Sequence, residues 1–216
     1  MQVILIGPPG VGKGTQAKLL QERFQLPHIS SGDLLRAAVK RKTETGLQAK
    51  RYMDRGELVP NPLVVSIIEE RVREADCQPG FILDGFPRNV AQAEALAPML
   101  ASVAKQVDHV ISLIVPREEI IKRLSGRRTC RECGAMYHII FNPPVNTGLC
   151  NKCNGELYQR DDDQEDTIVA RLDVFQRETE PLLAYYRTRS LLREVDGVGS
   201  SEQVLDRILT RIPAPQ

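Results

Sequence analysis

A glycine-rich segment near the start of the chain most constrains the fold. Residues 7–15 read GPPGVGKGT and directly follow the apolar run VILI at 3–6. A buried strand that runs into such a turn and then a helix is the layout of a phosphate-binding loop, because successive backbone N–H groups can converge on an anion. Lys13 supplies a charge for the outer phosphates, although Gly14 separates it from Thr15, whereas the common pattern places the hydroxyl directly after the lysine. The segment predicts nucleotide binding, the alternative being a tight strand-to-helix turn.

Strand and helix patterns alternate along most of the chain. Short apolar runs predict strands at 3–6, 27–29, 81–84, 109–115 and 192–195. Periodicity and capping signals predict helices at 14–24, 34–40, 61–72, 90–101, 116–124, 167–189 and 201–212. Strands separated by helices imply an α/β fold, a five-stranded parallel sheet flanked by helices, in which ligands bind off the carboxyl ends of the strands.

Two segments interrupt this alternation. Residues 40–60 are polar and charged, which predicts a small helical excursion rather than part of the core. Residues 126–163 have poor periodicity, several glycines and two consecutive prolines, and they contain the paired cysteines. The sequence therefore predicts one core with two small insertions, the second held together by a metal ion.

The cysteines of the second insertion have metal-ligand spacing. They are Cys130-x₂-Cys133-x₁₆-Cys150-x₂-Cys153, which is typical of a four-thiolate zinc site. Four protein ligands leave no position for a substrate water, so we interpret the site as structural. Iron in place of zinc, or a disulfide pair under oxidation, are the alternatives. The fifth cysteine, Cys77, is interpreted as a helix-end or core thiol.

A second polar cluster, Asp84-Gly85-Phe86-Pro87-Arg88, ends the predicted strand 81–84. Asp84 lies at the same sheet edge as the phosphate loop, where a carboxylate is placed to hold Mg²⁺ through water. Gly85 allows a ligand to approach the backbone, and Arg88 offers a planar donor fork for a second phosphate. A strand-end cap for Asp84 and a solvated surface position for Arg88 are the alternatives.

Composition argues against several classes of protein. The net charge is +1, so no bulk polyanion partner such as nucleic acid is indicated. No apolar stretch approaches the length of a membrane span, and the run 3–6 is too short for a signal peptide, so we expect a cytoplasmic protein without membrane contacts. The histidines His28, His109 and His138 are expected to pack or cap, and general-base chemistry is poorly supplied, whereas arginines are abundant.

The motifs together resemble the adenylate kinase family in its long form with a zinc-binding lid. The matching segments follow the family's order through nearly the whole chain: 7–15, 30–33 with Arg36, 55–60, 84–88 with Gln92, Arg123 with 126–128, the four cysteines, 141–144, and 160–163 with Arg171. The resemblance implies a P-loop kinase core (1–29, 60–125 and 164–216), an AMP-binding insertion (30–59) and a zinc-binding lid (126–163). It also implies reversible phosphoryl transfer from MgATP to AMP, giving two ADP, and we expect a monomer.

The resemblance assigns roles to residues of this chain. ATP would contact Gly10, Val11, Gly12, Lys13, Gly14, Thr15, Arg123, Arg127 and Gly199. AMP would contact Ser31, Arg36, Glu57, Leu58, Val59, Gly85, Phe86, Pro87, Arg88, Gln92, Arg160 and Arg171. The catalytic residues would be Lys13, Arg88, Arg123, Arg160 and Arg171, with Asp162 and Asp163 near the hinge and the closed lid. The family often has threonine at position 31 and lysine at position 199; Ser31 keeps the hydroxyl, and Gly199 keeps only the backbone.

Elementary chemistry agrees with these roles, because phosphoryl transfer requires positioning and charge stabilisation rather than a covalent nucleophile. Three rival interpretations remain: a kinase with another monophosphate or donor, a zinc-ribbon nucleic-acid binder with an auxiliary phosphate loop, and a nucleotide-responsive switch without enzymatic activity. Near-neutral charge and the few aromatic residues between the cysteines disfavour the second. The number of arginines available to a second phosphate site disfavours the third.

Overall fold

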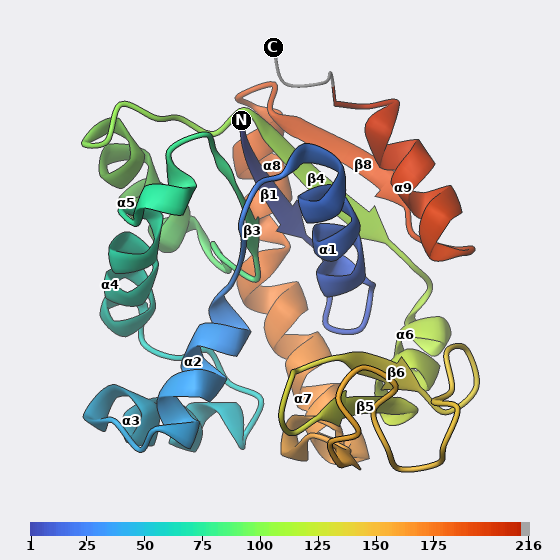
Figure 1. The fold of residues 1–216 in the computed structure, drawn as a ribbon. Helices are drawn as coiled ribbons and strands as arrows, with labels where there is room; N and C mark the ends of the chain where they lie inside the picture. Colours follow the sequence, from blue (N-terminus) through green and yellow to red (C-terminus); the bar gives the residue numbers. More distant parts are fainter. Residues whose placement is uncertain (213–216) are drawn as a thin grey trace.

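The computed structural model describes residues 1–212, and its core is a single parallel β-sheet (Figure 1). Five strands lie in the order β2-β3-β1-β4-β8, and every neighbouring pair is parallel. These strands are β1 (Gln2–Ile6), β2 (His28–Ser30), β3 (Phe81–Asp84), β4 (His109–Ile114) and β8 (Leu192–Asp196). The predicted five-stranded parallel sheet is confirmed.

Helices cover both faces of this sheet, which explains why its three central strands, β1, β3 and β4, are largely apolar. Alternate residues of β1 point to opposite faces: Ile4 and Ile6 belong to one core cluster, and Val3 and Leu5 belong to the other. Helices α4 (Asn61–Val72), α5 (Val90–Ala101) and α8 (Pro181–Arg187) contribute to the first cluster. The second cluster receives side chains from α1 (Lys13–Phe24), α6 (Arg117–Ser125), α7 (Glu165–Val174) and α9 (Ser201–Leu209).

The predicted continuous helix 167–189 is wrong in detail, because a π-helical turn (Phe175–Thr179) separates α7 from α8. The cause lies at Pro181, which has no N–H to continue the regular hydrogen bonding and whose ring clashes with the carbonyl four residues earlier. Glu180 N–H instead donates to the Phe175 carbonyl at 2.9 Å, a bond that spans five residues. Such turns occur often at functional sites, and Phe175 and Thr179 line the main cavity.

Two helix boundaries differ by three residues from the predicted ones. The helix predicted at 34–40 begins three residues earlier, as α2 (Ser31–Lys40), because the Ser30 hydroxyl caps it by accepting from Asp33 N–H at 3.3 Å. The helix predicted at 201–212 is α9 and ends at Leu209. The last residues of the predicted core segment 164–216, 213–216, lie outside the described residues.

Two small units stand at the carboxyl ends of the sheet strands (Figure 1). Helices α2 and α3 (Glu44–Met53) form the predicted helical excursion. Within 126–163, β5 (Arg127–Cys130), β6 (Met136–His138) and β7 (Leu157–Tyr158) form an antiparallel sheet in the order β6-β5-β7, which the sequence did not predict. Short helical turns, η1 (Ala75–Cys77) and η2 (Asp161–Asp163), complete the fold. The domain boundaries at 30–59 and 126–163 stay predictions.

None of the helices within residues 1–212 combines the length and the apolar character that crossing a bilayer requires.

Candidate active site

The phosphate loop joins β1 to α1 and depends on glycine where φ is positive. Gly10 has φ 80° and Gly12 has φ 107°. A Cβ atom on Gly10 would lie 2.6 Å from Leu124 Cγ, so the loop also packs too closely there for any larger residue. Lys13 opens α1, and its Nζ donates to the carbonyls of Gly7 (2.7 Å) and Pro8 (2.9 Å). The lysine head is therefore held against the loop that a phosphate would enter.

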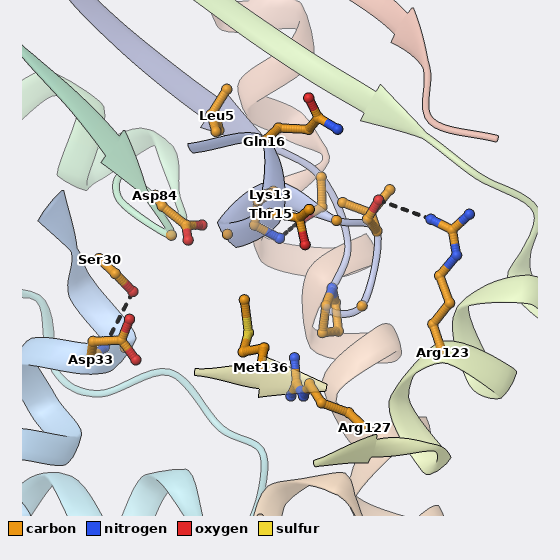
Figure 2. A pocket seen from close by; sticks show the side chains of 18 of the residues that line it. Leu5, Lys13, Thr15, Gln16, Ser30, Asp33, Asp84, Arg123, Arg127 and Met136 are labelled. Atoms are coloured by element: carbon orange, nitrogen blue, oxygen red, sulfur yellow. Dashed lines mark hydrogen bonds between the residues drawn. The ribbon is translucent and has the colours of Figure 1, made fainter. Parts of the chain in front are cut away.

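The loop forms one wall of a cavity of about 1020 Å³ at the carboxyl edge of the sheet (Figure 2). Residues 197–201 line it beside the loop, and 31–33, 35–36, 56–59, 84–85 and 87–88 line it elsewhere. Lid residue Met136 points toward the loop, and a Cβ atom on Gly14 would lie 3.2 Å from its Cε. Ligand pockets usually measure about 300–1,000 Å³. This cavity therefore lies at the upper end of the range for ligand pockets.

Asp84 ends β3 and faces Lys13 across the cavity (Figure 2). Burial raises the pKa of Asp84, but the hydrogen bond from His28 and the charge of Lys13 outweigh burial, so the pKa is lowered. The carboxylate stays ionised, as a group that holds Mg²⁺ through water must. His28 Nε2 lies 3.3 Å from Asp84 Oδ2 in the cavity wall, a polar role that the predicted packing or capping role did not specify.

Buried positive charges crowd the cavity. Burial, together with the charge of the neighbouring Arg171, lowers the pKa of Arg88 to about 10. Burial and the charge of Arg36 lower the pKa of Arg160 to about 10. Burial lowers the pKa of Lys13 to about 8, with Arg88 acting in the same direction. Like charges held together out of water create a strongly positive potential, which suits a polyphosphate ligand.

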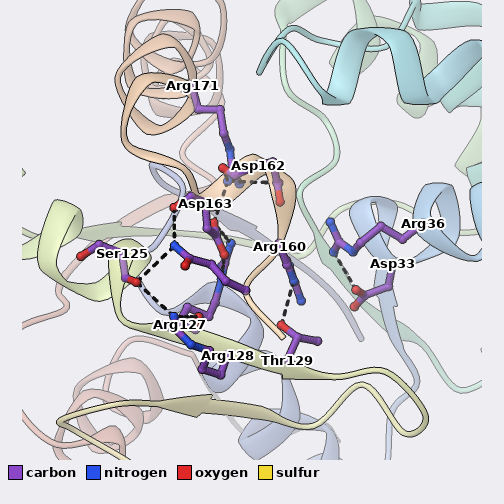
Figure 3. A network of polar contacts seen from close by, with 11 residues as sticks. Asp33, Arg36, Ser125, Arg127, Arg128, Thr129, Arg160, Asp162, Asp163 and Arg171 are labelled. Carbon is purple, nitrogen blue, oxygen red and sulfur yellow. Dashed lines mark hydrogen bonds and ion pairs between the residues drawn. The ribbon is translucent and has the colours of Figure 1, made fainter. Parts of the chain in front are cut away.

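Two neighbouring carboxylates, Asp162 and Asp163, hold the side chains of Arg127 and Arg171 (Figure 3). Asp163 is fully buried and accepts from Arg127 Nε at 2.7 Å and from Arg171 Nη1 at 3.1 Å. Arg171 Nη1 also lies 3.1 Å from Asp162 Oδ2. Asp162 and Asp163, which the family resemblance places near the hinge, are therefore the partners that orient two of the arginines.

Arg160 and Arg36 are held by residues outside the acidic segment 161–163. Arg160 Nε donates to Thr129 Oγ1 of lid strand β5 at 2.9 Å. Arg36 Nη2 donates to Asp33 Oδ1, one turn earlier on α2, at 2.7 Å (Figure 3). Burial raises the pKa of Asp33, but the charge and the hydrogen bond of Arg36, together with the charge of Arg160, outweigh burial and lower the pKa to about 2, so the pair stays ionised.

Arg123 connects the phosphate loop with the loop after β8. Its Nη1 donates to the carbonyls of Val11 (3.2 Å) and Gly197 (3.3 Å). Its Nε donates to Glu119 on the same helix at 3.1 Å, which holds the guanidinium in this direction. Arg123 therefore stands at the predicted ATP side of the cavity, as Figure 2 shows.

Gln92 belongs to a hydrogen-bond network at the predicted AMP side of the cavity. Its Oε1 accepts from Arg88 N–H at 2.7 Å, and its Nε2 donates to Asn61 Oδ1 at 2.9 Å. Ser31 Oγ donates to the Gly85 carbonyl at 2.6 Å, and Thr179 Oγ1 donates to the Arg88 carbonyl at 2.7 Å. These bonds fix the backbone around Arg88.

The cavity brings together the predicted nucleotide-site residues, with one exception. Phe86 does not line the cavity; its side chain is fully buried in the core cluster under α4 and α5. The sequence did not single out other lining residues, among them Gln16, Met136, Tyr137, Phe175 and Thr179. Met136 and Tyr137 lie on β6, a strand that no periodicity revealed. Thr179 depends on the unpredicted π-helical turn.

The four lid cysteines fit a zinc ion. Their Sγ atoms all lie within 4.8 Å of one another, and the pairs Cys130–Cys153 and Cys133–Cys150 are 3.5 Å apart. Zn–S bonds of about 2.3 Å in a tetrahedron place sulfurs about 3.8 Å apart. The donor set closes the coordination shell, as expected for a structural rather than a catalytic site. Cys77 is separate from this cluster and fully buried, as predicted.

A phosphate loop and a buried arginine cluster on a doubly covered parallel sheet define a P-loop kinase acting on nucleotides. The model of the family described as "Adenylate kinase" matches residues 5–191. Proteins named adenylate kinase from Geotalea daltonii and Archaeoglobus fulgidus are 56% and 53% identical to the chain over 210 and 215 residues. The alignments cover 97% and 98% of this chain and 98% and 99% of those relatives. The chain belongs to the adenylate kinase family.

Proposed function

We infer that the chain transfers the terminal phosphoryl group of MgATP reversibly to AMP, giving two ADP. One observation carries this inference: a single cavity is lined by the phosphate loop and also by Arg36 and Arg88, with the buried Arg160 and Arg171 on its wall. A protein that bound one nucleotide would need only one of these phosphate sites. Two phosphate sites in one cavity support direct transfer between two bound nucleotides.

The charged residues act by positioning and by stabilising the transferring group. Lys13 and the loop N–H groups bind the phosphates of ATP, and Arg88 and Arg36 bind the phosphate of AMP. Arg123, Arg160 and Arg171 neutralise charge on the transferring group, a role worth ~10³–10⁵ in rate for a single arginine in related chemistry. Asp84 would hold Mg²⁺ through water, and the ion would neutralise negative charge on the phosphates of ATP.

Exclusion of water explains the two insertions. Water is abundant and competes with AMP as the acceptor, so transfer requires a closed cavity. Segments 30–59 and 126–163 act as covers that close over AMP and ATP and complete the arginine cluster when both substrates are bound. We propose that the protein works as a monomer in the cytoplasm. One chain by itself supplies both phosphate sites of the cavity, which supports the monomer.

The hydrogen bonds of Gln92 support adenine as the acceptor base. Arg88 N–H fixes Oε1 as the acceptor, so the amide NH₂ points the other way and one of its hydrogens is used by Asn61. The second hydrogen is a donor suited to N1 of adenine, which accepts, and unsuited to N3–H of uracil, which donates. We therefore expect AMP to be a better acceptor than UMP.

The test is ADP production in a coupled assay with ATP and Mg²⁺ and with AMP, CMP or UMP as acceptor. Activity should be greatest with AMP, and Arg88→Ala should lower kcat/KM for AMP by ~10³-fold or more, in the range of arginines that stabilise transferring phosphoryl groups. Arg187→Ala is the matched control, because this arginine is exposed and its one ion pair within residues 1–212 is with Glu194 on the surface at 3.2 Å. Full activity of Arg88→Ala, or preference for UMP, would contradict the assignment.

A further inference from the structure

Tyr137 connects the zinc cysteines with the nucleotide cavity. It lies on β6 opposite Arg128 of β5 and is only 7% exposed. Its side chain belongs to the small lid core with Cys130, Cys150 and Leu157. Its hydroxyl oxygen lies 3.4 Å from Cys150 Sγ, within hydrogen-bond range for sulfur, and the residue also lines the cavity.

The direction of this hydrogen bond follows from the state of the sulfur in a zinc site. Asn151 N–H donates to Tyr137 Oη at 2.9 Å, so Oη accepts there and its own proton stays available. A cysteine that ligates zinc is a thiolate without a proton, so the contact between Oη and Cys150 Sγ is donated by the tyrosine O–H. Cys150 Sγ also accepts from Lys152 N–H at 3.4 Å. The sulfur of Cys150 therefore receives two hydrogen bonds in addition to its place in the cluster.

We propose that Tyr137 is a positioning residue of the zinc site, whose O–H donates to the Cys150 thiolate and slows the loss of zinc. Four thiolates around Zn²⁺ carry a net charge of about −2, and donors to the sulfurs disperse this charge and fix their directions. Partners of this kind commonly change metal affinity by about 10–100-fold when removed. Through this hydrogen bond, the zinc site is connected to β6, the strand that lines the cavity from the lid.

The chain offers a matched control in Tyr158. This tyrosine lies on β7 of the same lid sheet, and the Arg131 guanidinium stacks over its ring at 4.4 Å. Within the part of the chain that the structure describes, its hydroxyl makes no hydrogen bond to a cysteine. Tyr137→Phe and Tyr158→Phe therefore remove the same atom from the same small sheet, and only the first removes a donor to sulfur.

The first measurement is zinc transfer from the zinc-loaded full chain to a chromogenic chelator at fixed pH. Tyr137→Phe should release zinc about 10-fold faster than the unmodified protein, and Tyr158→Phe should match the unmodified protein. Equal rates for all three proteins would overturn the proposal. Equal acceleration in both variants would also overturn it, because it would indicate general loosening of the lid.

The second measurement distinguishes a hydrogen bond from packing. In the Co²⁺-loaded full chain, loss of a donor to a thiolate raises the energy of the sulfur electrons, so thiolate-to-cobalt charge-transfer absorption should move to longer wavelength. Tyr137→Phe should show this shift and Tyr158→Phe should not. Faster zinc release without a shift would refute the donor role, since the ring packing alone would then explain the release.

Discussion

Asp163 offers the sharpest test of how the arginine cluster is held. Its carboxylate is fully buried and accepts hydrogen bonds from Arg127 and Arg171, which come from a lid strand and from α7. Asp163→Asn keeps the size of the side chain but removes its charge. The amide would also turn N–H donors toward guanidinium donors, so the two arginines would lose their shared buried partner.

The magnitude follows from the burial of this ion pair. Removing one partner of a buried pair costs about 3–5 kcal/mol, because the remaining charge is left without compensation. For a chain of about 150–250 residues, each kcal/mol lowers Tm by about 2–4 °C. We therefore expect Asp163→Asn to lower the free energy of unfolding by ~4 kcal/mol and Tm by about 6–20 °C.

The assay is urea denaturation of the zinc-loaded protein followed by circular dichroism, since the chain has no tryptophan. Asp54→Asn is the control: Asp54 pairs with Lys50 at 2.6 Å, but both side chains are 47% exposed. Removing such a surface pair costs about 0.3–0.5 kcal/mol. If the two variants unfold within about 1 kcal/mol of each other, Asp163 is not the buried anchor inferred here.

Three other outcomes follow from the structure. Because burial lowers the pKa of Lys13 to about 8, the free enzyme loses the charge of Lys13 above that pH. The value of kcat/KM for ATP should therefore fall about tenfold for each pH unit above 8. A rate profile that stays flat to pH 10 would contradict the role of Lys13. Gly46→Ala should destabilise the protein by about 1–3 kcal/mol in thermal unfolding, because a Cβ atom would clash with the Ala38 carbonyl; unchanged Tm would refute this. Removal of zinc by a chelator should increase amide hydrogen exchange in β5–β7 and leave exchange in the parallel sheet unchanged; equal change in both would show that the lid does not depend separately on the metal.

The parallel sheet could be predicted because its strands are buried on both faces and their apolar runs are unambiguous. Residues 3–6 and 81–83 are fully or nearly fully buried, and these strands end at the loop and at the carboxylate that motif spacing had singled out. The strand order β2-β3-β1-β4-β8 was not predicted, because it depends on which face each connecting helix crosses. Periodicity records that a residue is buried, but not which neighbour buries it.

The lid sheet and the partners of the arginines could not be found in this way. Strands β5–β7 enclose only five clustered core residues, and the metal and backbone pairing replace apolar alternation. Asp163 meets Arg127 across 36 positions of sequence, and Arg160 meets Thr129 across 31. These pairings exist only once the lid has folded against α7, so the acidic run 161–163 alone could equally have been a solvated surface.

The electrostatic cost of the arginine cluster explains why the site suits two phosphate groups rather than one. Burial and like charge lower the pKa of both Arg88 and Arg160 to about 10 from an ordinary 12.5, and a shift of this size corresponds to ~3 kcal/mol for each group. Phosphate oxygens offset that repulsion without reorganising the protein, because Thr129 and the Gly85 carbonyl already orient the guanidinium groups. Arg88 is proposed to bind AMP and Lys13 to bind ATP, so a single nucleotide would relieve only part of the repulsion. Full stabilisation of the closed cavity then requires both substrates, which is the condition under which transfer to AMP outcompetes transfer to water.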